Sequence, residues 1–124
     1  MARDIIIAVH TLRVKAQLNE SPTAELIWES LPIEGTGNTW GDEIYFSIPV
    51  KADLEPEARE EMEKGELGYW PSGNAFCIFF GPTPMSRGEE IRAASPVNPI
   101  GKVTGDPEVF RGIQTGVKVR IEKG

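Results

Sequence analysis

The apolar run from Ala75 to Phe80 is the feature that most constrains the fold of this chain. The run reads AFCIFF, has no polar residue and does not alternate, and it lies within Gly65–Ser86, which begins with glycine and carries prolines on both sides of the run. A short apolar run between turn signals is typical of a strand that is buried on both faces. We therefore expect neighbouring strands on either side of it.

Segments with a two-residue period surround this run in the sequence. Ile5–Val9 and Leu12–Leu18 predict a hairpin that turns at His10 and Thr11, with one solvated face. Residues 117–122 alternate between apolar and charged side chains, which predicts a C-terminal strand. Further short strands are expected at residues 44–50, 67–70, 75–80, 91–94 and 97–103.

Helices are expected to be few and short. Ser21 and Pro22 supply an N-cap and a proline at the first helical position, and apolar residues follow at helical spacing. The acidic segment 55–66 and the segment after Asp106 predict two further short helices. The sequence thus predicts about eight short strands and two or three helices, without an alternating βαβ pattern. This count favours a mainly β protein. The favoured architecture is a closed eight-stranded antiparallel barrel, because closure removes sheet edges. A β-sandwich is the alternative.

Length and charge limit the classes of partner. The 124 residues predict a single domain, 1–124, and 19 acidic against 13 basic residues give a net charge of −6. This balance repels phosphate backbones and anionic lipids, so neither nucleic acid nor a membrane is an expected partner. The five apolar residues after Asp4 are too few for a signal peptide or a membrane span, so a cytoplasmic location is expected.

The polar and reactive residues form no recognisable catalytic or metal motif. One cysteine and one histidine, His10, exclude a cysteine cage and an internal disulfide, and no cofactor or metal is expected. Asp42 and Glu43 are adjacent, so they point to opposite faces of an extended chain and predict a solvated turn instead of an acid/base pair. Cys77 lies inside the buried run, where burial raises the pKa of its thiol and makes it unreactive.

Four segments in the middle of the chain resemble a known family when taken together. They are NTWGDEIYF, GYWPSG, FFGPTPMS and SPVNPIGKV, and their combination is similar to small bacterial and archaeal cyclophilin-like proteins of unassigned function, over about Asn38 to Val119. The order of GELGYWPSGNAFCIFF and IGKVTGDPEVFRGI resembles true cyclophilins more weakly. This resemblance implies an eight-stranded barrel closed by helices.

The same resemblance implies prolyl isomerase chemistry only in part. True cyclophilins hold a proline ring in an apolar pocket while an arginine in an FHR-like strand eases rotation about the prolyl bond. That motif is absent here, and Phe110 and Arg111 fall in a predicted helix. The glutamine of the family's SQFF motif is also missing.

Aromatic residues suggest where a ligand would bind. Adjacent aromatic pairs on a strand send one ring inward and one outward, so part of the aromatic set is expected to line a cleft beside polar loops. The candidate ligand-binding residues are Trp40, Tyr45, Tyr69, Phe79, Thr83, Arg92, Ser95 and Asn98. For Ser95 and Asn98 the alternative is that they only fix irregular backbone near Pro96 and Pro99, either of which could be preceded by a cis bond.

Three hypotheses follow for function. The first is a module that binds a small molecule or a proline-containing peptide in the aromatic cleft without chemistry of its own. The second is a weak or divergent prolyl isomerase, with Arg92 as the replacement arginine and Phe79 as the floor of the proline pocket. The third is an accessory domain that pairs with another subunit or forms a homodimer.

Overall fold

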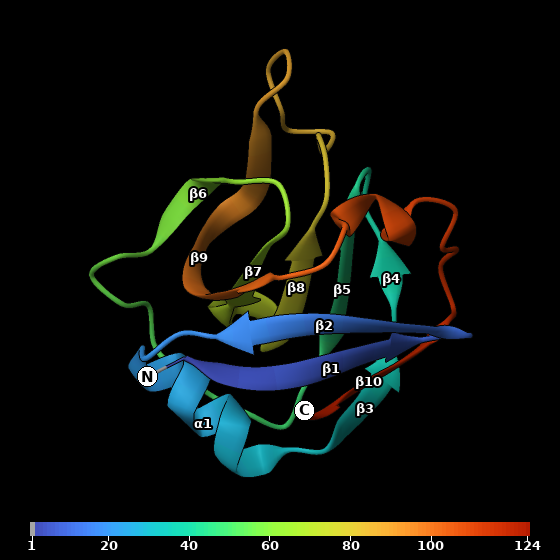
Figure 1. Cartoon of the computed structure of the whole chain (residues 1–124). Coiled ribbons are helices and arrows are strands. Elements are labelled where there is room, and N and C mark those ends of the chain that lie inside the picture. Colours follow the sequence, from blue (N-terminus) through green and yellow to red (C-terminus); the bar gives the residue numbers. More distant parts are fainter. Residues whose placement is uncertain (1) are drawn as a thin grey trace.

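The computed structural model describes residues 2–124 and consists mainly of antiparallel β-strands (Figure 1). There is one α-helix, α1 (Pro22–Ser30), and there are two 3-10 segments, Pro71–Gly73 and Pro107–Phe110. The strands are β1 (Arg3–Val9), β2 (Leu12–Leu18), β3 (Ile33–Thr36), β4 (Asn38–Thr39), β5 (Glu43–Ser47), β6 (Arg59–Met62), β7 (Glu66–Trp70), β8 (Ala75–Phe79), β9 (Ile91–Val103) and β10 (Lys118–Lys123). None of the helices in this described part has the length and apolar character to cross a bilayer.

The mainly β class is confirmed, but the closed barrel is not, because the sheet remains open at one seam. The strand order is β3-β10-β1-β2-β9-β7-β8-β5-β4, and β6 pairs with β9 beside this path. Only Gly37 separates the two edge strands in sequence, yet within residues 2–124 no β-ladder joins them. The backbone of Gly37 is already engaged, since its N–H donates to the Val117 carbonyl at 2.7 Å and its carbonyl accepts from Gly116 at 2.9 Å.

Several predicted elements are confirmed. The first two strands form the expected hairpin, and His10 occupies its turn with a φ of 56°. Helix α1 begins after Ser21, whose Oγ accepts a hydrogen bond from the Ala24 N–H at 3.2 Å. β8 lies between β7 and β5, and every one of its residues is buried. The absence of alternation in this run therefore correctly predicted a strand that is buried on both faces.

Two predicted elements are wrong. Residues 59–62 of the acidic segment form strand β6 and not a helix, because they pair with β9, where Glu61 faces Arg92. The two strands expected at 91–94 and 97–103 are one 13-residue strand, β9. Pro99 is accommodated because it faces Gly68 at an irregularity in the β7–β9 ladder, where proline is tolerated. The cis peptide bond precedes Pro32 instead of Pro96 or Pro99.

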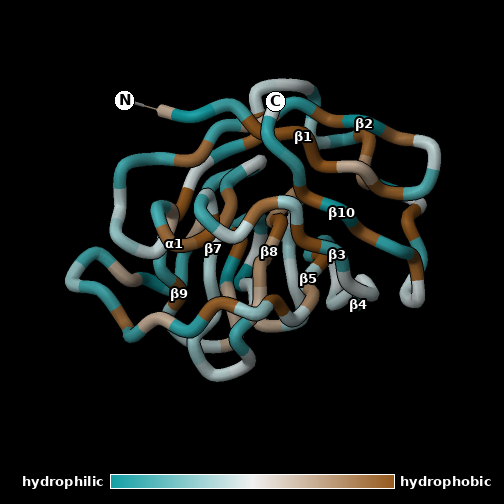
Figure 2. The backbone as a smooth tube through the Cα atoms, turned by 90° about the horizontal axis from the view of Figure 1, so that it is seen from below, coloured by the Kyte–Doolittle hydropathy of each residue, from teal (hydrophilic) through white to brown (hydrophobic). Residues whose placement is uncertain are grey.

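Buried side chains form two clusters, one on each face of β8. The larger cluster includes Phe76 and Ile78 and the apolar residues of β1, β2 and β10. Figure 2 shows the corresponding alternation of hydrophobic and hydrophilic residues along β10. The smaller cluster, called the second core here, consists of Met62, Ala75, Cys77, Phe79, Ile91, Ala93 and Val97. A Cβ at Gly68 would lie 3.0 Å from Val97 Cγ2, so the glycine lets β9 close over this face.

Candidate functional site

A cavity of about 190 Å³ lies at the edge of the second core. Its walls come from the β4–β5 turn, from β5 and β7, and from the first half of β9. The lining side chains are Trp40, Glu43, Tyr45, Trp70, Ala93, Ala94 and Val97. We call this space the aromatic cavity, because three of its seven lining residues carry aromatic rings.

The turn between β4 and β5 places two of these residues together. The Trp40 N–H donates to the Glu43 carbonyl at 2.9 Å, which leaves a two-residue loop with Gly41 at a φ of 60°. A positive φ at the first loop position is what a tight hairpin turn of this kind requires, and glycine adopts it without strain. Asp42 turns away and pairs with Arg111 at 2.7 Å. Glu43 consequently points to the opposite face, into the cavity wall.

Glu43 is a buried carboxyl group without a cationic partner. It is 6% exposed, and among residues 2–124 no arginine, lysine or histidine forms an ion pair with it. Burial raises its pKa from 4.5 to about 7, opposed by a hydrogen bond from the Cys77 side chain. The predicted solvated turn is therefore wrong for Glu43, although the two adjacent carboxyl groups do point apart.

Cys77 is buried beside this carboxyl group. Burial is the main cause that raises the pKa of its thiol, and the neighbouring Glu43 raises it further. The prediction of a buried thiol with a raised pKa is confirmed.

The aromatic wall is held rigidly. Tyr45 and Trp70 pack edge to face, with ring centroids 6.4 Å apart and an interplanar angle of 79°. Trp70 Nε1 donates to Ser95 Oγ at 2.6 Å, which fixes the indole against β9. Ala93 and Ala94 of β9 also line the cavity, and their small side chains leave the space open.

Among the predicted site residues, the structure brings Trp40 and Tyr45 to the cavity and places Ser95 behind Trp70. Tyr69 lies elsewhere, because it is fully buried and its hydroxyl donates to the Val50 carbonyl at 2.6 Å. Strand alternation therefore sends Trp70, and not Tyr69, to the cavity. Phe79 is fully buried in the second core and does not line the cavity.

Two further predicted site residues fix backbone instead. Asn98 is fully buried; its Oδ1 accepts from the Glu55 N–H at 2.8 Å and its Nδ2 donates to the Asp53 carbonyl at 2.9 Å. The Thr83 hydroxyl donates to the Arg92 carbonyl. For Asn98 this is the alternative role that the sequence left open.

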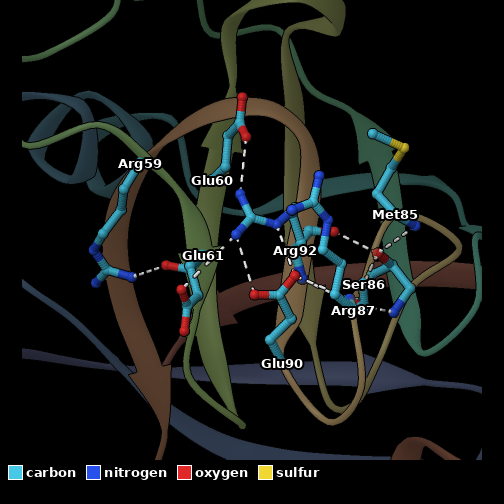
Figure 3. Close-up of polar contacts among 9 residues, drawn as sticks. Arg59, Glu60, Glu61, Met85, Ser86, Arg87, Glu90 and Arg92 are labelled. Atoms are coloured by element: carbon cyan, nitrogen blue, oxygen red, sulfur yellow. Dashed lines mark hydrogen bonds and ion pairs between the residues drawn. The ribbon is translucent and has the colours of Figure 1, made fainter.

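Arg92 does not reach the aromatic cavity. Its guanidinium group binds Glu90 at 2.9 Å and Glu60 at 3.1 Å, as Figure 3 shows. Its neighbours Ile91 and Ala93 belong to the second core, so alternation directs Arg92 to the other face of β9. The arginine that the isomerase hypothesis requires is thus engaged by carboxylates and absent from the lining of the cavity.

Sequence reasoning missed Glu43, Trp70 and the three β9 residues of the cavity. Glu43 could have been found, because it stands two residues before Tyr45 and so shares its strand face. The choice between Tyr69 and Trp70 needs the strand register, which the sequence does not contain. Among the described residues, no group of three or more histidine, cysteine, aspartate or glutamate side chains is placed to hold a metal ion.

Comparisons with known proteins agree on the fold. The family model described as cyclophilin-like matches residues 3–122. The hypothetical protein AF2241 from Archaeoglobus fulgidus, known from its solution structure, is 35% identical with a TM-score of 0.84; the match covers 99% of this chain and 95% of that one. McbB, solved in complex with tryptophan, is 16% identical with a TM-score of 0.70, over 96% of this chain and 44% of that one. No curated protein matches the chain.

Proposed function

This chain belongs to the cyclophilin-like family, and we propose that it binds a small molecule, or one side chain of a peptide, in the aromatic cavity. The observation that carries this proposal is the composition of the cavity wall: three aromatic rings around one buried carboxyl group. A concave apolar site with a single polar group that fixes orientation is the usual form of a ligand site.

The volume of the cavity limits the size of the ligand. An engineered apolar cavity of about 150 Å³ binds benzene, whereas drug-sized ligands need roughly 300–1,000 Å³. The aromatic cavity, at about 190 Å³, therefore suits a group the size of one ring. Either a one-ring molecule or the ring of a larger ligand meets this limit.

The complex of McbB with tryptophan is consistent with this proposal. The match covers 44% of the McbB chain, and at 16% identity the likeness extends to the fold alone. We therefore treat indole and tryptophan as probes and not as the natural ligand.

Titration with indole, followed by tryptophan fluorescence, tests the proposal. Trp40 and Trp70 line the cavity, so binding should change the emission. Ala94→Phe fills the cavity from an exposed position and should weaken binding at least tenfold, while Arg92→Ala, which lies outside the cavity, should not alter it. Indole binding that Ala94→Phe leaves intact, or no binding of any one-ring probe, would contradict the proposal.

The isomerase hypothesis can be tested with the same control variant. A protease-coupled assay on an X-Pro peptide should show no acceleration over the spontaneous rate. Acceleration that Arg92→Ala abolishes would restore this hypothesis.

A further inference from the structure

We propose that the group bound in the aromatic cavity is a small organic cation, an ammonium head group that lies against the rings and beside the Glu43 carboxylate. This inference rests on the proposed function, since it names the chemical class of ligand for the same cavity. It is carried by two features: the aromatic walls and the buried acidic group without a cationic partner.

The aromatic walls favour a positive charge. The rings of Trp40, Tyr45 and Trp70 border one small space, and the faces of such rings attract cations within about 6 Å of the centroid. Aromatic enclosures of this kind recognise alkylated ammonium groups. Tyr45 and Trp70 are held at fixed geometry by their edge-to-face contact and by Ser95, so the enclosure exists before a ligand enters.

The acidic group adds a negative charge at the same place. Glu43 lines the cavity, is 6% exposed and, within residues 2–124, lies in no ion pair with the protein's own cations. Its chain neighbour Asp42 is engaged on the opposite face, where it binds Arg111. A carboxylate removed from water is unfavourable unless a cation approaches it, and an ammonium group in the cavity would meet that need.

Other classes of ligand fit less well. An anion would meet the Glu43 carboxylate and the net charge of −6 without a compensating cation in the cavity wall. A neutral apolar group would contact the rings but would leave Glu43 without a cationic partner. The ammonium class uses both features at once.

Choline and 3,3-dimethylbutan-1-ol provide a matched pair of probes, because they have nearly the same shape and differ in charge. We expect choline to bind at least tenfold more tightly, by tryptophan fluorescence or calorimetry. Glu43→Gln should remove most of this difference, because it should weaken the binding of choline far more than that of the alcohol. Thermal unfolding of the variant would establish that it is folded.

A pH series on the unaltered protein gives a second readout that needs no variant. Choline keeps its charge at every pH, so a change in its affinity reports on the protein. The titratable groups beside Glu43 are Tyr45 on β5 and Cys77 on β8, and burial raises the pKa of the Cys77 thiol, which keeps it protonated over this range. We expect the affinity for choline to rise several-fold from pH 6 to pH 8 as Glu43 ionises, and the affinity for the alcohol to stay constant.

The outcomes separate this inference from the proposed function. Equal affinities for the two probes, or a preference for the alcohol, would overturn the cation inference while indole binding still supported a ligand cavity. A preference for choline that survives Glu43→Gln and is independent of pH would also overturn it. Failure of indole and of both probes would remove the proposed function and the inference together.

Discussion

Asp42 and Glu43 are chain neighbours in opposite environments, and the difference comes from strand geometry. Asp42 ends in an ion pair with Arg111 on the surface, whereas Glu43 enters the cavity wall beside Cys77. Because successive side chains on extended backbone point to opposite faces, the first cannot be buried with the second. The Asp42 carboxylate thus stabilises the turn through an ion pair, while the Glu43 carboxyl group lines the aromatic cavity.

Replacement of Glu43 by glutamine should change how stability depends on pH. The carboxyl pKa is about 7 in the folded chain against 4.5 as the ordinary value, so the folded form retains a proton between these values. This contribution is fully present below pH 4.5 and is lost as the pH rises through 7; at about 1.4 kcal/mol per pKa unit the loss amounts to about 3 kcal/mol. Urea unfolding at pH 5 and pH 8 should show this decline in the unaltered protein and a smaller one in Glu43→Gln.

An exposed glutamate provides the control for that experiment. Glu57 is exposed, and Glu57→Gln should leave the pH dependence as it is in the unaltered protein. If Glu43→Gln and the unaltered protein lost stability equally between the two pH values, Glu43 would not be a buried acid.

Cys77 should react with thiol reagents only when the chain unfolds. Its side chain is buried in the second core, so a reagent cannot reach it. Its pKa is also raised, so little of the reactive thiolate forms. Labelling with an aromatic disulfide reagent should be slow in native protein and fast in denaturant. Rapid labelling under native conditions would mean that the second core opens readily.

At the scale of elements, β9 connects the two halves of the molecule. It pairs with β2, β6 and β7, and it supplies one wall of the aromatic cavity. Its bend toward β2 depends on Gly101, where an added Cβ would lie 2.0 Å from the Gln17 carbonyl oxygen. No side chain can be accommodated there without movement of the backbone.

Gly101→Ala should therefore destabilise the protein by more than about 3 kcal/mol, a size typical of enforced backbone strain. Gly105→Ala is the matched control on the following segment, because an added Cβ there meets only Val14 Cγ1, at 4.0 Å. The control should stay within about 0.5 kcal/mol of the unaltered protein. Urea unfolding of both variants measures the difference; similar values would show that β2 and β9 are less closely packed than described.

The limits of sequence-based prediction are also clearest at the element scale. The β1–β2 hairpin and the buried β8 could be predicted, because alternation and its absence report directly on burial. Strand β6 could not, because Ala58 and Met62 have the four-residue spacing of a helix, and the strand partners of β6 lie on β9, some 30 residues later in the chain. For the same reason, the sequence could not show that Trp70, and not Tyr69, lies beside Trp40 and Tyr45 in the cavity wall.

At the scale of the whole molecule, the family could be predicted from motifs and the mainly β class from the number of short strands, while the open seam could not be predicted. Between the two edge strands, the backbone of Gly37 bonds to residues 116 and 117, which are far away in the sequence. The cavity likewise needs four segments that only the folded sheet brings together. A site of this kind has no local sequence motif, which explains why aromatic content alone indicated it.

The most direct test of the central claim, that the aromatic cavity is a ligand site, is an NMR titration of the three tryptophan indole N–H signals. Trp40 and Trp70 line the cavity, whereas Trp28 lies on α1 between Arg3 and Lys123 and serves as an internal control. We expect indole or choline to shift the Trp40 and Trp70 signals along one binding curve and to leave Trp28 in place. Signals of Trp40 and Trp70 that do not move, or that move no more than Trp28, would contradict the claim.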